Sequence, residues 1–369
     1  MLTENLKQIT SVKEFNTITK VERKRLTDFG GQLSDLTASF GGDDQYQTLR
    51  QWRQDLFEAL PDDVLPRVHV LTLAESEPVG LALETHLKAI RDHGSSPNVV
   101  RRHLEAAFAY MTPYAFFSRR DTQSKTEQEY GYGTAPVSTP LGESLSSPVP
   151  SSEPQAIFPI LRAALPAALS VGQTLRTLGF SYQFVTARVA RPDTGDAYNL
   201  TYFVDQSLMY IPSTSVEGAP LTILDPLIAA GGSIITAHRL SAGFKPSRVT
   251  VFSLCATAYG LIQVVRNLRK QGMDPMVYTA DIGHLDAQGR VRPAFGDIGD
   301  RLHGEEERGK IRSLDELIGL YRPMELLLYQ PEIDAIFKAA VQQTPQTLRP
   351  IVSPRHDNPA DYGAGPAQS

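Results

Sequence analysis

The clearest structural signal in this chain lies in Leu221-Thr222-Ile223-Leu224-Asp225-Pro226-Leu227-Ile228-Ala229-Ala230-Gly231-Gly232-Ser233. The apolar run at its start is typical of a buried strand. The glycine pair permits a tight turn that brings backbone N–H groups close to a ligand, and the helix expected from about Ser233 directs its positive end to the same point. An ordinary strand-to-helix connection would also account for the glycines. The acidic residue at the strand tip, Asp225, adds a group that can hold two neighbouring hydroxyls of a ribose, so the stretch predicts a phosphate cradle with a sugar-binding carboxylate.

Two further segments carry related signals, one before this stretch in the chain and one after it. Phe158-Pro159-Ile160-Leu161-Arg162-Ala163-Ala164-Leu165 places an arginine at a strand tip, where its guanidinium presents a fork of donors to phosphate oxygens. The second is Pro293-Ala294-Phe295-Gly296-Asp297-Ile298-Gly299-Asp300-Arg301. The three segments together resemble the signature of type I phosphoribosyltransferases, and of their uracil phosphoribosyltransferase branch in particular. The resemblance covers roughly residues 69 to 304, and in its earlier part the sequence from Leu87 to Tyr110 is similar to the family's N-terminal helical region.

The resemblance implies an α/β fold: a type I phosphoribosyltransferase-like parallel sheet flanked by helices, with a flexible hood and helical terminal extensions. The pattern of the chain itself agrees, because strands and helices alternate from Ala156 onward, and such alternation indicates a parallel sheet that binds ligands at the carboxyl ends of its strands. We expect a polar hairpin after a strand that ends at Arg191, in the place of the hood. The other expected elements are strands over 156–161, 221–224, 249–254 and 276–281, and helices that end near 178, 241 and 270.

The reaction implied by the resemblance is displacement of pyrophosphate from 5-phosphoribosyl pyrophosphate (PRPP) by a ring nitrogen of uracil or another small planar acceptor. Such a site needs an anion clamp, a metal and a close base pocket more than a nucleophilic side chain. Mg²⁺ is expected on PRPP itself, since it prefers pyrophosphate and hydroxyl oxygens, and Asp225 would reach it directly or through water. The resemblance assigns catalytic roles to Arg162, Asp225 and Asp297. It assigns PRPP binding to Arg162, Arg191, Asp225, Pro226, Ala229, Ala230, Gly231, Gly232 and Ser233, and acceptor binding to Arg292, Ala294, Phe295, Gly296 and Asp297.

Three positions depart from the family pattern. Ala230 stands where the phosphate loop usually has threonine, so one hydroxyl donor is lost, and Tyr259-Gly260 replaces an expected acidic-glycine pair. In the base loop, Arg292 and Ala294 occupy positions that are commonly aliphatic and glycine. These departures leave two alternatives open beside uracil transfer. One is a specialised-metabolism phosphoribosyltransferase with a non-uracil acceptor, and the other is a non-catalytic, nucleotide-sensing regulator on the same fold.

The chain divides into a main domain with additions at both ends. Residues 1–64 are expected to form a helical N-terminal extension, with apolar stripes that the main domain or another subunit must cover. The uracil phosphoribosyltransferase-like domain is expected over 65–304, and within it 118–153 is polar enough to be a long loop or a partly disordered insertion. We expect a helical C-terminal extension over 305–343 and a disordered tail over 344–369. The stripes comprise Leu26, Phe29, Leu33 and Leu36, and Leu49, Trp52, Leu56 and Leu60.

Composition narrows the class of protein and its partners. The chain has 369 residues and a formal net charge of −5, which argues against nucleic acid as the main partner. Its single cysteine, Cys255, lies in an apolar run and is interpreted as a core residue rather than a catalytic thiol. We find no apolar segment long enough to cross a bilayer and no signal core, so a cytoplasmic protein without a membrane partner is expected. The resemblance and the apolar stripes suggest a homodimer or a higher homo-oligomer.

Overall fold

A computed structural model describes most of the chain up to His303. The described residues are 6–11, 15–38, 43–73, 77–117, 132–138, 140, 144–150, 154–161, 163–190, 201–210 and 216–303. Arg162 and Arg191 lie outside them, as do the C-terminal extension expected over 305–343 and the tail expected over 344–369.

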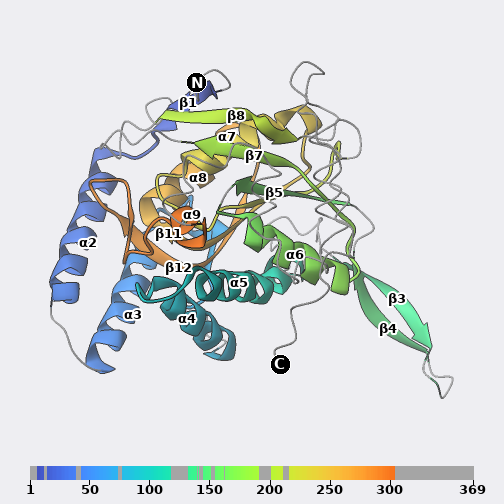
Figure 1. Cartoon of the computed structure of the whole chain (residues 1–369), viewed down its shortest axis with the longest axis horizontal. Helices are drawn as coiled ribbons and strands as arrows, with labels where there is room; N and C mark the ends of the chain where they lie inside the picture. Colours follow the sequence, from blue (N-terminus) through green and yellow to red (C-terminus); the bar gives the residue numbers. More distant parts are fainter. Residues whose placement is uncertain are drawn as a thin grey trace, which may run out of the picture.

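A large, mostly parallel sheet forms the centre of the molecule (Figure 1). Within the described residues it has 11 strands: β1 (Leu6–Ser11), β2 (Val68–Val70), β5 (Gln155–Leu161), β6 (Tyr182–Phe184), β7 (Thr186–Ala190), β8 (Thr201–Tyr210), β9 (Leu221–Leu224), β10 (Leu227–Ile228), β11 (Val249–Thr257), β12 (Met276–Leu285) and β13 (Val291–Arg292). The order is β1-β8-β7-β5-β9-β11-β12-β13, with β10 paired to β11, β2 to β12 and β6 to β5. The pairings from β7 through β5, β9 and β11 to β12 are parallel, while β1 with β8, β8 with β7, and β12 with β13 pair antiparallel. The predicted α/β architecture is therefore confirmed.

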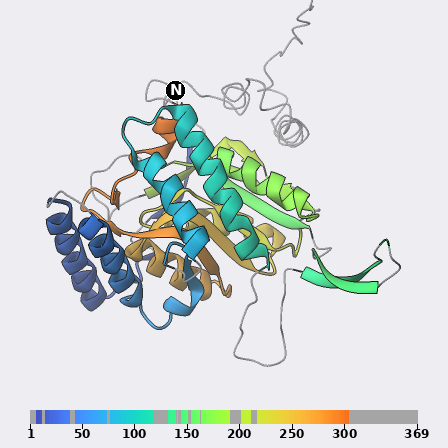
Figure 2. The same cartoon turned by 90° about the horizontal axis from the view of Figure 1, so that it is seen from below.

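Helices cover both faces of the sheet, so the central strands β5, β9, β11 and β12 are almost entirely buried (Figures 1 and 2). The helices are α2 (Lys20–Ala38), α3 (Asp43–Glu58), α4 (Glu77–Arg91), α5 (Pro97–Phe117), α6 (Leu165–Thr177), α7 (Gly232–Ser241), α8 (Ala258–Lys270) and α9 (Ile298–His303), with short 3₁₀ turns η1 (Leu65–Arg67) and η2 (Ala242–Phe244). One core lies between the sheet and α2, α3, α7 and α8, and a second lies between the opposite face and α4, α5, α6 and α9. In the described residues no helix combines the length and apolar character needed to cross a membrane.

The strand and helix boundaries differ from expectation mainly at the carboxyl ends of two strands. Strand β11 continues to Thr257 because the short strand β10 pairs with Cys255 and Ala256. Strand β12 continues to Leu285 because β13 folds back on its last residues. In both cases the extra residues are ordered by pairing with a segment that is close in space, and a local pattern does not report such pairing.

The N-terminal extension packs on the main domain. The predicted stripes of α2 and α3 face the first core, where Leu26, Leu33, Trp52 and Leu56 are buried. The Trp52 indole N–H donates to the Phe29 carbonyl at 3.1 Å, which joins the two helices. The extension also contributes strand β1, which pairs with β8 at the edge of the sheet and was not predicted.

A two-stranded ribbon occupies part of the stretch expected to be a loop or insertion. Strands β3 (Tyr132–Ser138) and β4 (Ser144–Pro150) pair antiparallel and form a sheet separate from the central one. The ribbon projects away from the body of the molecule (Figures 1 and 2). The polar composition that suggested a loop does not exclude a ribbon, because backbone pairing needs no apolar core of its own.

Candidate active site

The predicted phosphate loop has the geometry of an anion-binding turn. Strand β9 ends at Leu224, Asp225 follows, and α7 begins at Gly232, one residue before the expected start. Gly231 caps the helix in the left-handed conformation at φ 82°. The first N–H groups of α7 have no partner within the helix, so they and the helix dipole point to the turn. The loop can therefore receive a phosphate at the carboxyl end of the parallel sheet.

Helix α8 supports this loop from the side. A Cβ added to Gly231 would lie 2.9 Å from Val264 Cγ2, and one added to Gly260 would lie 2.3 Å from the Ala229 carbonyl oxygen. The Thr257 hydroxyl donates to that same carbonyl at 2.5 Å and accepts from the Gly260 N–H at 2.9 Å. Thr257 therefore caps α8 and joins this helix to the phosphate loop. Gly260, in one of the unusual pairs of the sequence, is thus required for close contact between α8 and the phosphate loop.

Two small residues of the loop face protein rather than open space. Ala230 is 1% exposed and belongs to the first core. A Cβ on Gly232 would lie 2.0 Å from the ring of Tyr202, a buried residue on the hood strand β8. The Tyr202 ring centroid is also 6.3 Å from that of Phe15. Tyr202 of the hood strand therefore packs against both the N-terminal extension and the start of α7.

Asp225 stands at the tip of β9, as predicted. Its backbone N–H donates to the Phe252 carbonyl at 3.0 Å, and its Oδ1 accepts from the Leu227 N–H at 3.4 Å. These bonds hold the partly buried carboxylate at the mouth of the loop. Pro226 follows it, and its carbonyl accepts from the Ser253 hydroxyl at 3.1 Å. Ala229, Ala230, Gly231, Gly232 and Ser233 complete the predicted set, whereas Arg162 and Arg191 fall outside the described residues.

The predicted acceptor loop follows β12 and β13 and is anchored at Phe295. The Phe295 side chain is buried, and its carbonyl accepts from Arg301 Nη1 at 3.0 Å. Arg301 also donates to the carbonyls of Ile90 and Asp92 at the end of α4. Gly296 has φ 73°, so this position favours glycine. The hydrogen bonds of Arg301 therefore attach the loop to α9 and to the end of α4.

Asp297 and Arg292 both have partners within the protein. Asp297 Oδ1 accepts from the Asp300 N–H at 3.0 Å, which makes Asp297 the N-terminal cap of α9. Arg292 is 44% exposed in its side chain, and its Nε donates to Asp286 Oδ2 at 2.8 Å. Ala294 is exposed between them. The cation that distinguishes this loop in the sequence is thus paired across the β12–β13 turn.

The two loops leave the same edge of the sheet. Strand β11 lies between β9 and β12, and the register pairs Cys255 of β11 with Asp281 of β12. A Cβ on Gly283 would lie 2.4 Å from the Arg292 carbonyl, so β13 crosses close over the end of β12. The structure thus brings the phosphate loop and the acceptor loop to neighbouring positions at the carboxyl ends of parallel strands, where this fold class binds ligands.

Sequence reasoning assigned no role to a buried cluster of charges beside the acceptor loop. Asp281 is 0% exposed and is paired with Arg53 of α3 and Arg91 of α4. Burial opposes the charge on Arg53, but the carboxylates of Asp281 and Glu84 outweigh it and raise the pKa of its guanidinium. Burial and the nearby Asp281 raise the pKa of the Cys255 thiol, which supports its interpretation as a neutral core residue. An acidic residue within the apolar run of β12 was the signal that could have revealed the cluster.

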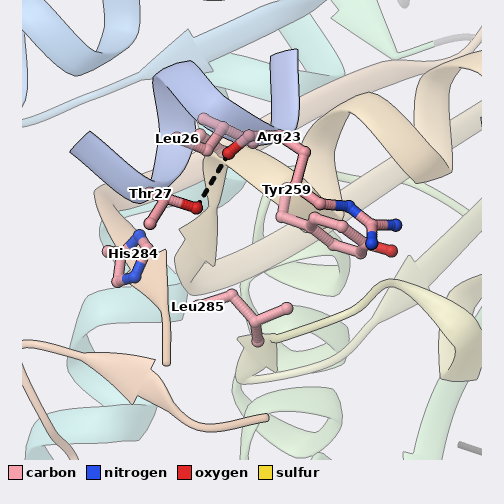
Figure 3. Close-up of a pocket in the computed structure, with 7 residues that line it drawn as sticks. Arg23, Leu26, Thr27, Tyr259, His284 and Leu285 are labelled. Atoms are coloured by element: carbon pink, nitrogen blue, oxygen red, sulfur yellow. Dashed lines mark hydrogen bonds between the residues drawn. The ribbon is translucent and has the colours of Figure 1, made fainter. Parts of the chain in front are cut away.

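A shallow hollow lies between α2, the start of α8 and the end of β12 (Figure 3). Its volume of about 10 Å³ admits little more than one water molecule. The Arg23 guanidinium lies beside Tyr259 there, and His284 faces Thr27. Burial lowers the pKa of His284, partly opposed by Asp286. The hollow is too small to be a substrate site. It is lined by Arg23, Leu26, Thr27, Ala258, Tyr259, His284 and Leu285.

The expected Mg²⁺ would depend mainly on oxygen atoms of the substrate. Within the described ranges, no group of three or more His, Cys, Asp or Glu side chains is arranged to hold a metal ion. Asp225 offers a hard carboxylate oxygen at the mouth of the phosphate loop, where a metal on pyrophosphate and ribose hydroxyls could use it. The donor set therefore fits a metal that arrives with PRPP and takes Asp225 as a direct or water-mediated ligand.

Comparison with known proteins identifies the family of the chain. The sequence profile of the family described as uracil phosphoribosyltransferase matches residues 82–304. The uracil phosphoribosyltransferase of Synechococcus elongatus is 31% identical over 173 residues, which cover 46% of this chain and 73% of that protein. The one from Kineococcus radiotolerans is 29% identical over 221 residues, 59% of this chain and 92% of that protein. A solved structure of a protein from Aquifex aeolicus aligns with 64% of this chain and 98% of its own, at 20% identity and a TM-score of 0.47. Because the family profile spans more than half of its length, the chain belongs to the uracil phosphoribosyltransferase family.

Proposed function

We propose that this protein transfers the 5-phosphoribosyl group of PRPP to a ring nitrogen of uracil or a related small planar acceptor and releases pyrophosphate. Membership of the family makes the chain a phosphoribosyltransferase, and the proposal concerns its donor, its metal and its acceptor. The observation that carries it is the phosphate loop: Asp225 at the tip of β9, Gly231 at φ 82° and α7 opening at Gly232. A carboxylate for ribose hydroxyls and a helix start for a phosphate are combined within one turn.

Each part of the loop has a task in this reaction. The free N–H groups at the start of α7 bind the 5-phosphate, and Asp225 holds the ribose hydroxyls, so the anomeric carbon is placed in a fixed direction. The acceptor loop over 291–297 lies at the same edge of the sheet and presents backbone groups to a planar ring. Mg²⁺ carried by PRPP, with Asp225 as a direct or water-mediated ligand, would neutralise charge on the departing pyrophosphate. The hood hairpin of β7 and β8 would exclude water, which prevents hydrolysis of the donor.

Replacement of Asp225 tests the donor site. We expect Asp225→Ala to abolish measurable binding of PRPP with Mg²⁺ in calorimetry, because the ribose loses its hydroxyl acceptor. Asp274→Asn is the matched control, since Asp274 pairs with Arg67 at 2.7 Å on a partly exposed surface. Unchanged binding of PRPP to Asp225→Ala would contradict the site assignment.

An assay of pyrophosphate release tests the reaction itself. The unmodified protein is incubated with PRPP, Mg²⁺ and a panel of neutral and anionic planar bases. Release that depends on one of these acceptors, and that stops when Mg²⁺ is chelated, is the expected result. Tight binding of PRPP without release in the presence of any acceptor would favour the nucleotide-sensing regulator instead.

A further inference from the structure

The acceptor loop is connected to the N-terminal extension through buried charges. Arg91, at the end of α4, lies over the Phe295 ring with its Cζ 4.1 Å from the ring centroid. The same guanidinium donates from Nη2 to Asp281 Oδ2 at 2.5 Å. On the other side of Asp281, Arg53 Nε lies 3.1 Å from Oδ1. A single carboxylate therefore lies between the arginine that contacts the acceptor loop and an arginine of helix α3.

The buried Asp281 carboxylate is paired with both arginines. Its side chain is 0% exposed, and a buried carboxylate is costly unless it is paired and hydrogen-bonded. One further bond comes from the Ile282 N–H, which donates to Oδ1 at 2.9 Å. Arg53 is itself held by Glu84 of α4, whose Oε1 accepts from Nη1 at 2.7 Å. Arg53 thus hydrogen-bonds Glu84 through Nη1 and forms an ion pair with Asp281 through Nε, which makes no hydrogen bond within the described residues.

Arg91 has few other restraints on its position. Within the described part of the chain, its buried Nε makes no hydrogen bond. Its other contacts include the bond to Asp281, the face of Phe295 and the Cys255 thiol. If Asp281 turned, Arg91 would lose the carboxylate oxygen that fixes it against the ring. The position of Phe295 therefore depends on a carboxylate that is also paired with Arg53.

We propose that Arg53 is a positioning residue for the acceptor loop: through Asp281 it fixes Arg91 against Phe295 and so sets which planar acceptors the loop receives. This inference rests on the proposed function for the identity of the ligand. Arg53 lies outside residues 82–304, the part of the chain that matches the family, so the extension adds a determinant of acceptor specificity. Arg53 does not touch the acceptor and acts through two other side chains.

Hydrogen exchange tests the positioning without any need for turnover. In Arg53→Met, which keeps the length of the side chain and removes its charge, we expect faster exchange of backbone amides over 291–297. Amides over 225–233 should keep their protection, because the phosphate loop is held by α8 and not by Asp281. The control is Arg266→Met. Arg266 joins Glu22 and Asp63 of the extension to α8, at 2.7 and 2.8 Å, and does not contact the acceptor loop.

Kinetics then separate positioning from a general loss of structure. Arg53→Met should raise KM for the acceptor about 2- to 30-fold, the range for residues that act through a packed network, while KM for PRPP stays within about twofold. Arg53→Lys should give a smaller rise, because an ammonium keeps the charge but cannot bridge Glu84 and Asp281 in the same way. In a Phe295→Leu background, replacing Arg53 should have little further effect on KM for the acceptor.

Trp52, the chain's single tryptophan, reports whether each variant is folded. Trp52 is buried and directly precedes Arg53 in the sequence. Unfolding of α3 would therefore expose the indole to water and shift its fluorescence to longer wavelengths. If Arg53→Met fails this check, Arg53→Lys and the Phe295→Leu cycle carry the test. Unchanged exchange over 291–297 in a folded Arg53 variant would overturn the proposal. Absence of turnover in the unmodified protein, with faster exchange in the variant, would instead count against the proposed function alone.

Discussion

The phosphate loop and the acceptor loop lie at the same edge of one sheet, but they are held in place by different means. In the phosphate loop, backbone geometry is decisive: Gly231 has φ 82°, and α8 approaches so closely that Gly260 admits no side chain. In the acceptor loop, side chains are decisive, since Arg91 contacts the ring of Phe295 and Arg301 binds its carbonyl. The difference separates a loop fixed by its backbone from a loop whose shape distant side chains can adjust.

This contrast suits the chemistry of group transfer. Every acceptor would use the same phosphoribosyl donor, so the donor loop gains from a conformation that few substitutions can alter. Discrimination between acceptors would depend on contacts made by the acceptor loop. A loop held by side chains can change its shape when those side chains change, without loss of the sheet beneath it. The following predictions test whether the two loops are independent in this sense.

The largest effect is expected from Gly231→Ala. An alanine at φ 82° is strained, and its Cβ would lie 2.9 Å from Val264 Cγ2 and 3.0 Å from the Gly260 carbonyl oxygen. We expect a loss of about 1–3 kcal/mol in the free energy of unfolding. PRPP affinity should fall about tenfold or more, as measured by calorimetry, because the helix start moves. Hydrogen exchange over 291–297 should remain unchanged.

The control for this variant is Gly243→Ala in η2. A Cβ at Gly243 meets nothing within 4 Å, so neither stability nor PRPP affinity should change appreciably. If Gly231→Ala disturbed both loops equally, the proposed independence of donor and acceptor sites would be wrong.

A smaller effect is expected from Ala230→Thr, which restores the hydroxyl usual in the family. An added hydrogen bond to the phosphate should tighten PRPP binding by about 0.5–3 kcal/mol. Ala230 is 1% exposed, however, and two extra atoms in a packed core cost about 1–3 kcal/mol of stability. Ala230→Val has nearly the same shape without the hydroxyl, so the difference between the two variants in calorimetry isolates the donor. Equal affinity in both would show that the loop has repacked around alanine.

The same contrast explains how much could be predicted from sequence. The backbone elements of the phosphate loop agree with the expectation, because their signals are local: an apolar strand, an acidic tip, two glycines and a helix start. The binding of PRPP to this loop stays a prediction. The boundaries of β9 and the end of α7 agree with the expectation. The apolar stripes of the extension were also foreseen, and the structure shows that the main domain covers them.

The anchors of the acceptor loop could not be foreseen in this way. Arg91 and Asp281 are separated by 190 positions in the chain, and Arg301 reaches carbonyls more than 200 positions away. Periodicity and propensity do not report such contacts, which arise only after the sheet has formed. Arg292 is a second example. The sequence suggests that its cation is available to an acceptor, whereas in the structure Asp286 accepts a hydrogen bond from its Nε.

The smallest effect is expected from the double variant Arg292→Ile with Ala294→Gly, which brings the loop closer to the usual family pattern. Removal of the Ala294 methyl group lets a ring approach the backbone more closely, whereas loss of an exposed Arg292–Asp286 pair costs about 0–1 kcal/mol. We expect uracil to be a poor substrate of the unmodified protein and the double variant to raise kcat/KM for uracil, with Ala294→Gly alone giving most of the gain. PRPP affinity should not change, because the phosphate loop is held independently. Efficient conversion of uracil by the unmodified protein would refute the altered acceptor preference and leave the phosphoribosyltransferase assignment intact.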